Sequence, residues 1–341
     1  MCDHHTDGWR RREFLGGLAL AGAAGILGLS SSIVTAEPPP ETTRIKLLYR
    51  RGNVCQGLLF LAQEALQQEG FTEVQYVVKS TVAEYNQALA SGEADLSTQF
   101  AATGIIYMEE GAPLVFLAGL HVGCIELFGT DKVRAIRDLK GKTVAVPALR
   151  GSHHILVASM LAYVGIDPRR DVTWVTHPLA ESARLLAEGK VDALLALAPE
   201  AQELRAKGIG HVVVNAMMDR PWSQYFCCVP TGHREFVRQQ PVATKRALRA
   251  ILRTADVIDH EPERVARTLV DRGYTTNYDY ALQALKEIRY AEWREYDAED
   301  TVRFYALRLH EAGMIKSSPQ KILAQGTDWR FFNELKKELK E

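Results

Sequence analysis

The sequence predicts an α/β protein built as two similar lobes, and two observations support this prediction. Short strand patterns alternate with helix patterns over residues 44–215, which is typical of mostly parallel sheets with helices on both faces. The segments 88–96 and 185–193 are near copies, since each reads as a helix end, a glycine, two further residues, an aspartate and a strand. Their separation of about a hundred residues is too long for a solenoid repeat and indicates two lobes of one design.

The composition excludes several classes of function. The chain has 341 residues, a net charge of −1 and 47% hydrophobic residues, an ordinary globular balance that suffices for two modest domains. No basic excess indicates a nucleic-acid partner, and no acidic tail or low-complexity segment is present. Beyond the N-terminal region, no apolar tract reaches the ~18 residues of a membrane-spanning helix, so we expect a soluble mature body.

Residues 1–36 have the order of an export signal, with a charged region, an apolar region rich in Gly and Ala, and a small-residue cleavage site. The charged region, Arg10-Arg11-Arg12-Glu13-Phe14-Leu15, resembles the twin-arginine signal, which carries already folded proteins. We therefore expect cleavage near Ala36, a short stiff linker at 37–43 and a location in the periplasm. An uncleaved membrane anchor is the alternative.

The first part of the body contains strand patterns separated by helices. Residues 44–49 alternate apolar and polar side chains, and the following helix ends at Gly70, a residue type favoured just after a helix. A small-residue loop at 99–104 is expected to open a later helix. In order, we expect a strand at 44–49, a helix at 58–69, a strand at 74–78, a helix at 82–90, a strand beginning near 96, a helix ending at 110, and strands at 113–120 and 125–129.

The second part repeats the pattern and a helical tail follows. β-branched residues predict a strand at 143–146, and Ser152 is a favoured N-cap for a helix at 152–164, which Pro168 stops. Next we expect a strand at 172–175, a helix at 178–188, a strand at 194–198, a helix at 200–207 and a strand at 211–215. Apolar residues at helical spacing then predict helices, packed around one lobe, at 241–258, 261–271, 278–288, 300–313, 319–323 and 329–339.

The stretch 141–156 is a candidate binding element. A helix that starts at Ser152 offers unpaired backbone N–H groups and a partial positive charge, which can hold an anion or a strong acceptor. An ordinary strand, loop and helix without a ligand is the alternative. Because ligands of parallel sheets bind outside the carboxyl ends of the strands, the candidate ligand loops are 50–57, 79–81, 99–104, 147–154 and 198–200.

Three features resemble the periplasmic solute-binding proteins of ABC importers. They are the export signal, the two glycine–aspartate turns and the segment 138–146, Asp-Leu-Lys-Gly-Lys-Thr-Val-Ala-Val. The chain looks most like the nitrate/sulfonate/taurine and thiamine-precursor binding group. The resemblance covers residues 44–335 and implies a type II, venus-flytrap fold whose two lobes close over a ligand. Lobe one would comprise 44–128 and 226–341 and lobe two 129–225, with crossovers near 124–131 and 222–229.

The resemblance also implies a function, partners and site residues. The protein would be a monomeric receptor, not an enzyme, that delivers a small organic solute to an ABC permease and its ATPase subunits. No cofactor, metal or nucleic acid is expected. The ligand contacts would come from Asn53, Val54, Cys55, Ser80, Thr81, Gln99, Ala101, Ala102, Gly151, Ser152, His153, His154, Glu200, Trp222 and Gln224.

Some of these residues have a second interpretation. His153 and His154 point about 100° apart on a helix, so we expect at most one of them to face the cleft. Trp222 is either a stacking wall for an aromatic ligand or a packed residue of the hinge. Glu200 would repel a sulfonate or nitrate, and basic residues are few in the loops, which favours a larger polar or heterocyclic organic solute. Sulfonates, taurine-like amines, pyrimidine precursors and aromatic acids remain open.

Four cysteines remain once the signal is removed, namely Cys55, Cys124, Cys227 and Cys228. An oxidising compartment permits disulfides, but the sequence does not pair the cysteines, and no CxxC or Cys/His spacing typical of a metal site is present. Cys55 matches the place of the nucleophilic cysteine in desulfinase relatives of the fold, so the alternative function is a desulfinase-like enzyme that uses Cys55. A sensor that reports its ligand state to a signalling partner is a third possibility.

Overall fold

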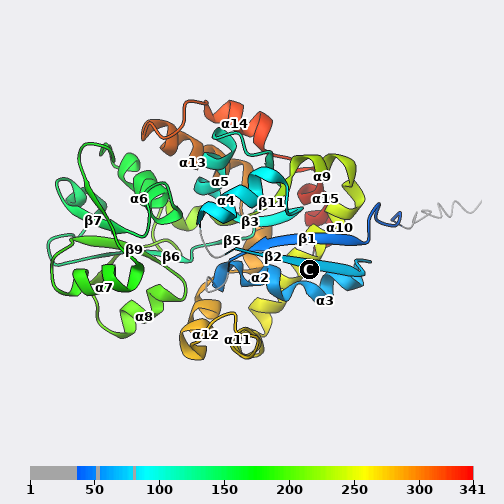
Figure 1. Ribbon diagram of the computed structural model, residues 1–341, viewed down its shortest axis with the longest axis horizontal. Coiled ribbons are helices and arrows are strands. Elements are labelled where there is room, and N and C mark those ends of the chain that lie inside the picture. The colour runs from blue at the N-terminus through cyan, green and yellow to red at the C-terminus, as the bar shows by residue number, and fades with distance from the viewer. Residues whose placement is uncertain (1–36, 51–53, 80–81, 341) are drawn as a thin grey trace, which may run out of the picture. The chain divides into compact units, whose positions relative to one another are not determined.

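The computed structural model describes residues 37–50, 54–79 and 82–340 (Figure 1). The chain from Pro39 onward forms one unit that contains two β-sheets flanked by helices. The α/β class and the helical C-terminal region are therefore confirmed. The expected export signal lies outside the described residues.

The first sheet holds β11 in its interior. Its strands lie in the order β2, β1, β3, β11, β4, and β5 also pairs with β11. Strands β2 and β3 run parallel to β1, whereas β11 runs antiparallel to β3, β4 and β5. The bounds are β1 Arg44–Tyr49, β2 Glu73–Val78, β3 Leu96–Phe100, β4 Leu114–Phe116, β5 His121–Val122 and β11 Phe226–His233.

The second sheet holds β6 in a similar interior place. Its strands lie in the order β10, β6, β9, β7, β8. Strand β7 runs parallel to β8 and β9, whereas β6 runs antiparallel to β9 and β10. The bounds are β6 Ile125–Gly129, β7 Thr143–Val146, β8 Thr173–Thr176, β9 Ala193–Leu197 and β10 His211–Asn215.

The sheets are mixed, which refines the expectation of mostly parallel sheets. Within each sheet, the strands that a helix connects run in one direction, as βαβ units require. The reversed strands are β6 and β11, and each enters its sheet directly from the other one. The chain passes to the second sheet at Gly123 and Cys124 and returns through residues 216–225.

Helices follow nearly every strand. Between the strands lie α2 Gly57–Leu61, α3 Gln63–Gln68, α4 Val82–Ser91, α5 Ala101–Glu109, α6 Ser152–Tyr163, α7 Leu179–Ala187 and α8 Glu200–Ala206. Short 3₁₀ turns lie at η1 Val54–Gln56, η2 Ile136–Leu139, η3 Trp222–Gln224 and η4 Ala291–Arg294. The C-terminal helices are α9 Arg234–Gln239, α10 Pro241–His260, α11 Pro262–Asp271, α12 Tyr278–Glu287, α13 Ala298–Glu311, α14 Pro319–Gly326 and α15 Arg330–Glu338.

Three local expectations are wrong. The helix predicted at 58–69 is divided at Ala62 into α2 and α3. The loop predicted at 99–104 is absent, because β3 pairs with β11 as far as Phe100 and α5 begins at the next residue. Ser152 is the first residue of α6 and not its N-cap, since Gly151 holds the extended cap backbone and no side chain caps the helix.

The C-terminal helices contact elements of both sheets. Helix α10 packs on α2 and α3, which belong to the first sheet, whereas α13 contacts both α5 and α6. Helix α12 contacts α8, where Arg205 forms an ion pair with Glu287. The sequence had suggested that the tail packs around one lobe. Instead, the tail contacts helices that follow strands of both sheets.

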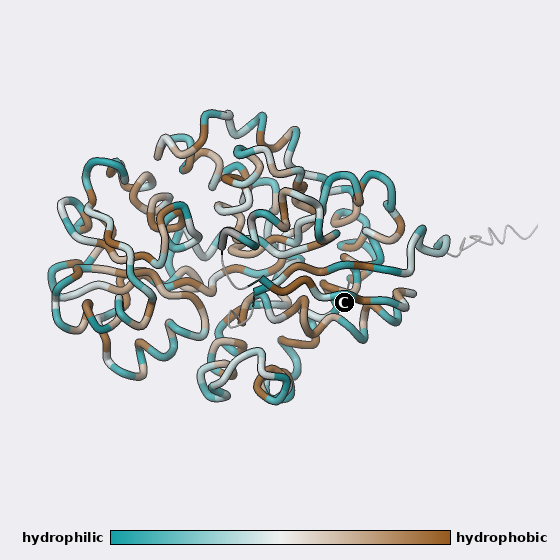
Figure 2. The backbone as a smooth tube through the Cα atoms, in the orientation of Figure 1, coloured by the Kyte–Doolittle hydropathy of each residue, from teal (hydrophilic) through white to brown (hydrophobic). Residues whose placement is uncertain are grey.

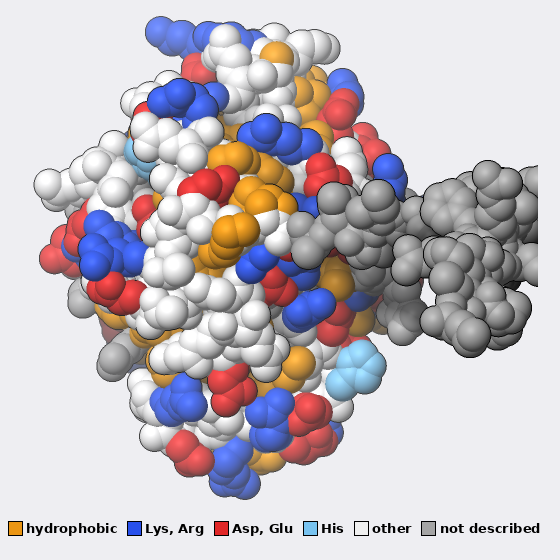
Figure 3. Space-filling model, turned by 90° about the vertical axis from the view of Figure 1, so that its right-hand side faces the viewer, with side chains coloured by type: hydrophobic (Ala, Val, Ile, Leu, Met, Phe, Trp, Pro, Cys, Tyr) orange, Lys and Arg blue, Asp and Glu red, His pale blue; other side chains and the backbone are white. Residues whose placement is uncertain are grey.

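The interior is hydrophobic and the described surface mixes charges. Strands β3, β6 and β9 are buried along their whole length, and Figure 2 shows hydrophobic residues along the strands of the sheets. On the face that Figure 3 turns to the viewer, acidic and basic side chains are interspersed around a small hydrophobic group. Within the described ranges, no helix is both long and apolar enough to cross a membrane.

The two near-copy turns perform the same structural task. The carboxylate of Asp95 accepts the backbone N–H of Lys46 at 2.7 Å, and that of Asp192 accepts the N–H of Thr143 at 2.9 Å. The backbone N–H of each aspartate also donates to the carbonyl of the same partner residue, at 2.9 and 2.8 Å. Each turn contains a glycine with φ of +68°. Each aspartate thus ties a strand that enters the sheet, β3 or β9, to the first strand of its repeat, β1 or β7.

We predict that Asp95→Ala and Asp192→Ala each lower the free energy of unfolding by about 1–2 kcal/mol, because each leaves a strand N–H without its acceptor. Urea unfolding followed by circular dichroism measures this loss. Asp131→Ala is the control, since Asp131 is exposed and pairs with an exposed Arg134. A loss as large in the control would contradict the assigned role of the two aspartates.

Candidate functional site

A cavity of about 260 Å³ lies against the carboxyl ends of strands from both sheets. Arg50 follows β1, Phe100 ends β3, Pro147 follows β7 and Leu197 ends β9. Because ligands of α/β sheets bind outside these ends, the cavity is the candidate binding site. Its lining consists of Arg50, Gln56, Tyr85, Gln99, Phe100, Tyr107, Pro147, Ala148, Gly151, Ser152, His153, Leu179, Leu197 and Glu200.

A hydrogen-bond network holds the polar side chains that the first sheet contributes. The amide nitrogen of Gln99 donates to the Tyr85 hydroxyl at 2.9 Å and to Ser97 Oγ at 3.1 Å. The carbonyl of Thr98 accepts from the Tyr85 hydroxyl and from Gln56 Nε2, both at 3.2 Å. Buried amides and hydroxyls are costly without partners, so this network fixes Gln99 and Tyr85 in one orientation.

The second sheet contributes the start of α6. The backbone of Gly151 is extended, α6 begins at Ser152, and the first-turn N–H groups have no partner within the helix. Arg150 precedes this turn with φ of +62° and forms an ion pair with Glu110, at the end of α5. The charge of Arg150 is therefore compensated outside the cavity, and Ser152 remains as a hydroxyl and N–H donor beside it.

The two histidines of α6 have different surroundings. His153 lines the cavity, whereas the ring of His154 packs edge-on against Trp174, with ring centroids 4.5 Å apart. The Nδ1 atom of His154 accepts the N–H of Arg150 at 3.3 Å. Burial lowers the pKa of both rings to about 4, assisted by the nearby Arg50 for His153 and by Arg150 for His154. At neutral pH both rings are therefore uncharged.

Glu200 and Arg50 give the cavity its charged groups. Burial raises the pKa of Glu200 to about 7, so the protonated and ionised forms are both populated near neutral pH. Its Oε2 atom is buried and has no hydrogen-bond partner in the described part of the chain. Arg50 is the single Lys or Arg among the lining residues. Among its described lining residues, the cavity therefore presents the positive charge of Arg50 and one carboxyl group that still requires a partner.

The predicted residues divide into three groups. Gln99, Gly151, Ser152, His153 and Glu200 line the cavity together, as expected for a two-sided cleft. Asn53, Ser80 and Thr81 lie outside the described residues. The remaining predicted side chains do not line it: Val54, Cys55, Ala101, Ala102, His154, Trp222 and Gln224.

Packing explains why these side chains lie elsewhere. Val54, Cys55, Ala101 and Ala102 are at most 1% exposed and belong to the hydrophobic core. Trp222 is 2% exposed and lies edge-on to Tyr163 and Phe304, with ring centroids 5.4 and 5.6 Å away.

Trp222 is therefore a packed residue of the returning segment and not a stacking wall of this cavity. Gln224, two residues later, is exposed.

Sequence reasoning missed several lining side chains. It selected the loops after the strands, but Tyr85 and Tyr107 lie on α4 and α5 and face the cavity from helices. Arg50 and Gln56 lie within the predicted loop 50–57, from which other residues were chosen. Pattern analysis shows that a helix residue is inward, but not whether it meets packed core or an open cavity.

Cys55 lacks what a nucleophile needs. Its side chain is fully buried, and burial raises the pKa of its thiol well above the usual range. The cavity lining does not include it. In this structure Cys55 therefore has neither access to a solute in the cavity nor a thiolate at neutral pH.

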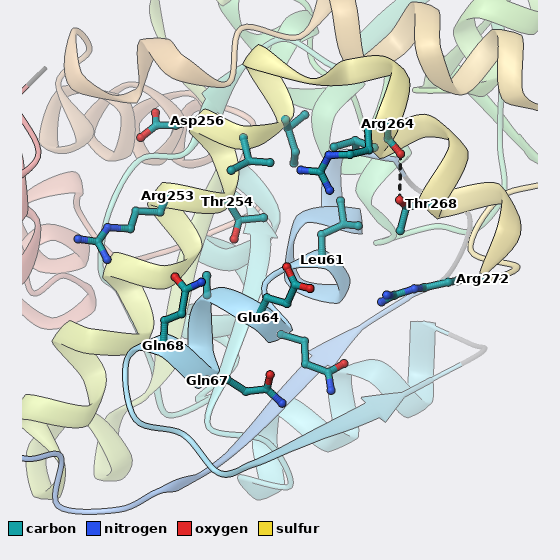
Figure 4. Close-up of a pocket in the computed structure, with 15 residues that line it drawn as sticks. Leu61, Glu64, Gln67, Gln68, Arg253, Thr254, Asp256, Arg264, Thr268 and Arg272 are labelled. Carbon is teal, nitrogen blue, oxygen red and sulfur yellow. Dashed lines mark hydrogen bonds between the residues drawn. The ribbon is translucent and has the colours of Figure 1, made fainter.

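A larger cavity, of about 660 Å³, lies among helices and is a weaker candidate. Figure 4 shows it between α2 and α3 on one side and α10 and α11 on the other, with Glu64, Arg253 and Asp256 at its walls. No strand end reaches it, and its charged groups are of mixed sign. The smaller cavity is preferred because fixed polar groups converge on it from two sheets.

The structure also assembles groups that could hold a metal, contrary to the expectation from sequence spacing. Cys55, His121 and Cys124 form one group and Cys124, Cys227 and Cys228 another, and the ligand atoms in each group all lie within 4.8 Å of one another. These residues come from three distant parts of the chain, so no local motif announces them. None of the four thiols is in a disulfide.

Comparisons with known proteins agree with this architecture. The model of the NMT1-like family matches residues 39–270. A comparison with curated protein sequences gives no match.

Solved structures with a similar fold include the periplasmic nitrate-binding protein NrtA from Synechocystis PCC 6803, with a TM-score of 0.71 and 16% identity over 89% of this chain and 90% of that one. The alkanesulfonate-binding protein SsuA from Xanthomonas axonopodis pv. citri, bound to MOPS, has a TM-score of 0.64 and 16% identity over 83% and 96%. The aliphatic sulphonate binding protein SsuA from Escherichia coli has a TM-score of 0.63 and 17% identity over 81% and 90%.

We predict that His153→Asn makes the stability of the protein less sensitive to acid. The folded-state pKa of His153 lies below its unfolded value, so the unfolded chain binds more protons and stability falls as the pH drops from about 6.5 toward 4. Urea midpoints at pH 7 and pH 5 should therefore differ less in the variant than in the parent. His260→Asn is the control, because His260 is exposed, and an equal effect there would refute the prediction.

Proposed function

Because the chain belongs to the NMT1-like family, we propose that the protein is a periplasmic receptor that binds a small organic solute and delivers it to an ABC permease with its ATPase. The observation that carries this proposal is the cavity of about 260 Å³, on which Arg50, Gln99, Ser152 and Glu200 converge from two sheets. The similar structures named as nitrate-binding and sulfonate-binding proteins support the same role. The export signal predicted at residues 1–36 is consistent with this location.

The charges of the cavity suggest the class of solute. Arg50 can bind an anionic group, and the first-turn N–H donors at Ser152 suit the same group. In its ionised form, Glu200 has an unpartnered oxygen that requires a hydrogen-bond donor, which nitrate and simple sulfonates lack. Apolar walls from Phe100 and Leu179 suit a short carbon skeleton. We therefore propose a small organic acid that also bears an amine, with taurine as the simplest probe.

The proposed action is closure of two lobes over the solute, with 44–128 plus 226–341 as one lobe and 129–225 as the other. Lining residues from both sheets would then contact the same molecule, so binding would favour the closed form. The proposed receptor acts as a monomer and leaves ATP hydrolysis to its partners. The enzyme alternative gains no support, since the thiol of Cys55 is buried away from the cavity.

The solute class is tested by calorimetry with taurine, ethanesulfonate and nitrate. We expect taurine to bind most tightly, and Arg50→Gln to weaken its binding at least tenfold, because a charge-assisted hydrogen bond is worth about 1.5–3 kcal/mol. Glu200→Gln should weaken taurine but leave ethanesulfonate, which has no amine, nearly unaffected. Arg253→Ala, in the larger cavity, is the matched control. The preference for the smaller cavity fails if Arg253→Ala weakens binding as much as Arg50→Gln does.

We further predict that Ser152→Pro weakens taurine binding about tenfold while the fold is retained. Proline is well tolerated at the first position of a helix, where Ser152 lies, and the preceding Gly151 already has the extended backbone that proline requires. The variant removes one hydroxyl and one N–H donor, a loss of about 1–1.5 kcal/mol. Calorimetry measures the affinity and circular dichroism the fold. An unchanged affinity in a folded variant would show that the start of α6 does not hold the solute.

A further inference from the structure

A buried cluster of five potential metal ligands lies at the points where the chain passes between the sheets. Cys55 lies in η1, His121 in β5, Cys124 in the turn between β5 and β6, and Cys227 with Cys228 at the start of β11. Cys55, His121 and Cys228 are completely buried and the other two are nearly so. The Sγ atoms of Cys124 and Cys227 are 3.2 Å apart. Cys124 belongs to both groups of three, so it is the centre of the cluster.

The ring of His121 is held as a ligand ring would be. Its Nδ1 atom lies 3.3 Å from the carbonyl oxygen of Val122, which fixes the proton on Nδ1 if the ring is neutral. The Nε2 atom is buried and has no hydrogen-bond partner among the described residues. A buried nitrogen lone pair without a partner is unfavourable. A metal-bound histidine usually donates a hydrogen bond from its other ring nitrogen to a carbonyl oxygen, as Nδ1 of His121 can do here.

The start of β11 is irregular where its two cysteines lie. Successive side chains of a regular strand point to opposite faces of the sheet, so adjacent cysteines would normally diverge. Here Phe226 pairs with Val122 and Cys228 pairs with His121, and the register shifts between Phe226 and Cys228. Such an irregularity re-aims a side chain. It brings the thiols of Cys227 and Cys228 into one group with that of Cys124.

The backbone of Cys124 is also unusual. Its φ is +67°, in the left-handed region where residues other than glycine are disfavoured. Gly123, just before it, also has positive φ, and its missing side chain leaves room for Met217. The turn therefore has one glycine where the space requires it and a cysteine where a second glycine would relieve strain. The thiol at this position is held by the surrounding structure in spite of that strain.

We propose that a set of ligands drawn from these five residues, with Cys124 as the shared member, binds a single thiophilic metal ion with a filled d shell, Zn²⁺ or Cu⁺. Thiolates and imidazole are the ligands both ions prefer, and each thiol that binds releases a proton. Metal–sulfur bonds of ~2.3 Å in a tetrahedron separate sulfur atoms by about 3.8 Å, which is longer than the 3.2 Å between Cys124 and Cys227 and shorter than the 4.8 Å within which the ligand atoms of each group lie. This spacing suits one ion and not the larger core of an iron–sulfur cluster. A Cys124–Cys227 disulfide would use only two of the thiols and leave His121 Nε2 without a partner.

The proposed ion would join both passages between the sheets. Cys124 lies at the first passage, and Cys227 with Cys228 directly after the second. The carbonyl of Cys124 accepts the N–H of Ala198 at 3.0 Å, and the carbonyl of Ala198 accepts the N–H of Val54 at 3.3 Å. The cluster is thus connected to Ala198, two residues before the start of α8 at Glu200, and it is a structural site beside the solute cavity. Its existence does not depend on the proposed receptor function.

The test uses the full chain, reduced and freed of metal by a chelator under anaerobic conditions. Zn²⁺ and Cu⁺ are titrated separately against chromophoric competitors, and the protein purified from its own host is analysed for zinc, copper and iron. We expect one equivalent of one of these two ions to bind and to raise the melting temperature. Cys124→Ser should lower the affinity more than about 100-fold, and His121→Phe at least tenfold, whereas His260→Asn should leave it unchanged.

Three results would overturn the proposal. The first is no stoichiometric binding of either ion by the parent chain, which is decisive even if a variant fails to fold. The second is an affinity that neither Cys124→Ser nor His121→Phe alters, since the ion would then lie elsewhere. The third concerns the protein purified from its own host. The proposal fails if that protein lacks both ions and contains a Cys124–Cys227 disulfide, which lowers its mass by two hydrogens. It also fails if that protein contains iron with labile sulfide.

Discussion

The architecture depends on one topological constraint, the insertion of a reversed strand into the interior of each sheet. Strand β6 lies between β9 and β10, and β11 lies between β3 and β4. Each follows directly on a passage from the other sheet, so the two passages are held by the hydrogen bonds of whole strands. This arrangement brings the carboxyl ends of both sets of parallel strands against one cavity and brings the cysteines of both passages together.

The chemistry of the cavity follows from exclusion of water more than from the number of its charges. Burial keeps His153 uncharged and brings the pKa of Glu200 to about 7, so Arg50 supplies the lasting charge. The network around Gln99 and Tyr85 is satisfied within the protein, whereas an oxygen of Glu200 is not. In the proposed receptor, a solute would therefore meet a fixed cation at one point and an acceptor in need of a donor at another.

Sequence analysis predicted the parts of this structure that depend on local patterns. Alternation and helical periodicity placed most elements, and the repeated glycine–aspartate turns proved to tie equivalent strands through Asp95 and Asp192. The rule of strand ends also selected loops that line the cavity. These features are readable because each depends on residues close together in the chain.

Features that depend on distant contacts were not readable in this way. Packing of His154 against Trp174 decides which histidine meets the cavity, and burial of Trp222 against Phe304 removes it from the site. The reversed direction of β6 and β11 follows from the passages between sheets and not from their own residues. The cluster of potential metal ligands extends from Cys55 to Cys228, across about half of the chain, so spacing rules had nothing to detect.

The interior position of β11 has a consequence for biosynthesis. The first sheet begins with residues that leave the ribosome early, yet its interior strand, Phe226–His233, emerges only after every strand of the second sheet. Until then β3 and β4 have no shared neighbour, and the backbone N–H of Phe226 still awaits Thr301, whose hydroxyl accepts it at 3.1 Å. The first sheet therefore cannot reach its final form until the second sheet has been made, whereas the second sheet, which uses only residues 125–215, does not depend on β11. A first sheet completed this late suits the twin-arginine route that the sequence predicts, and on that route any ion at the cysteines would be acquired before the protein left the cytoplasm.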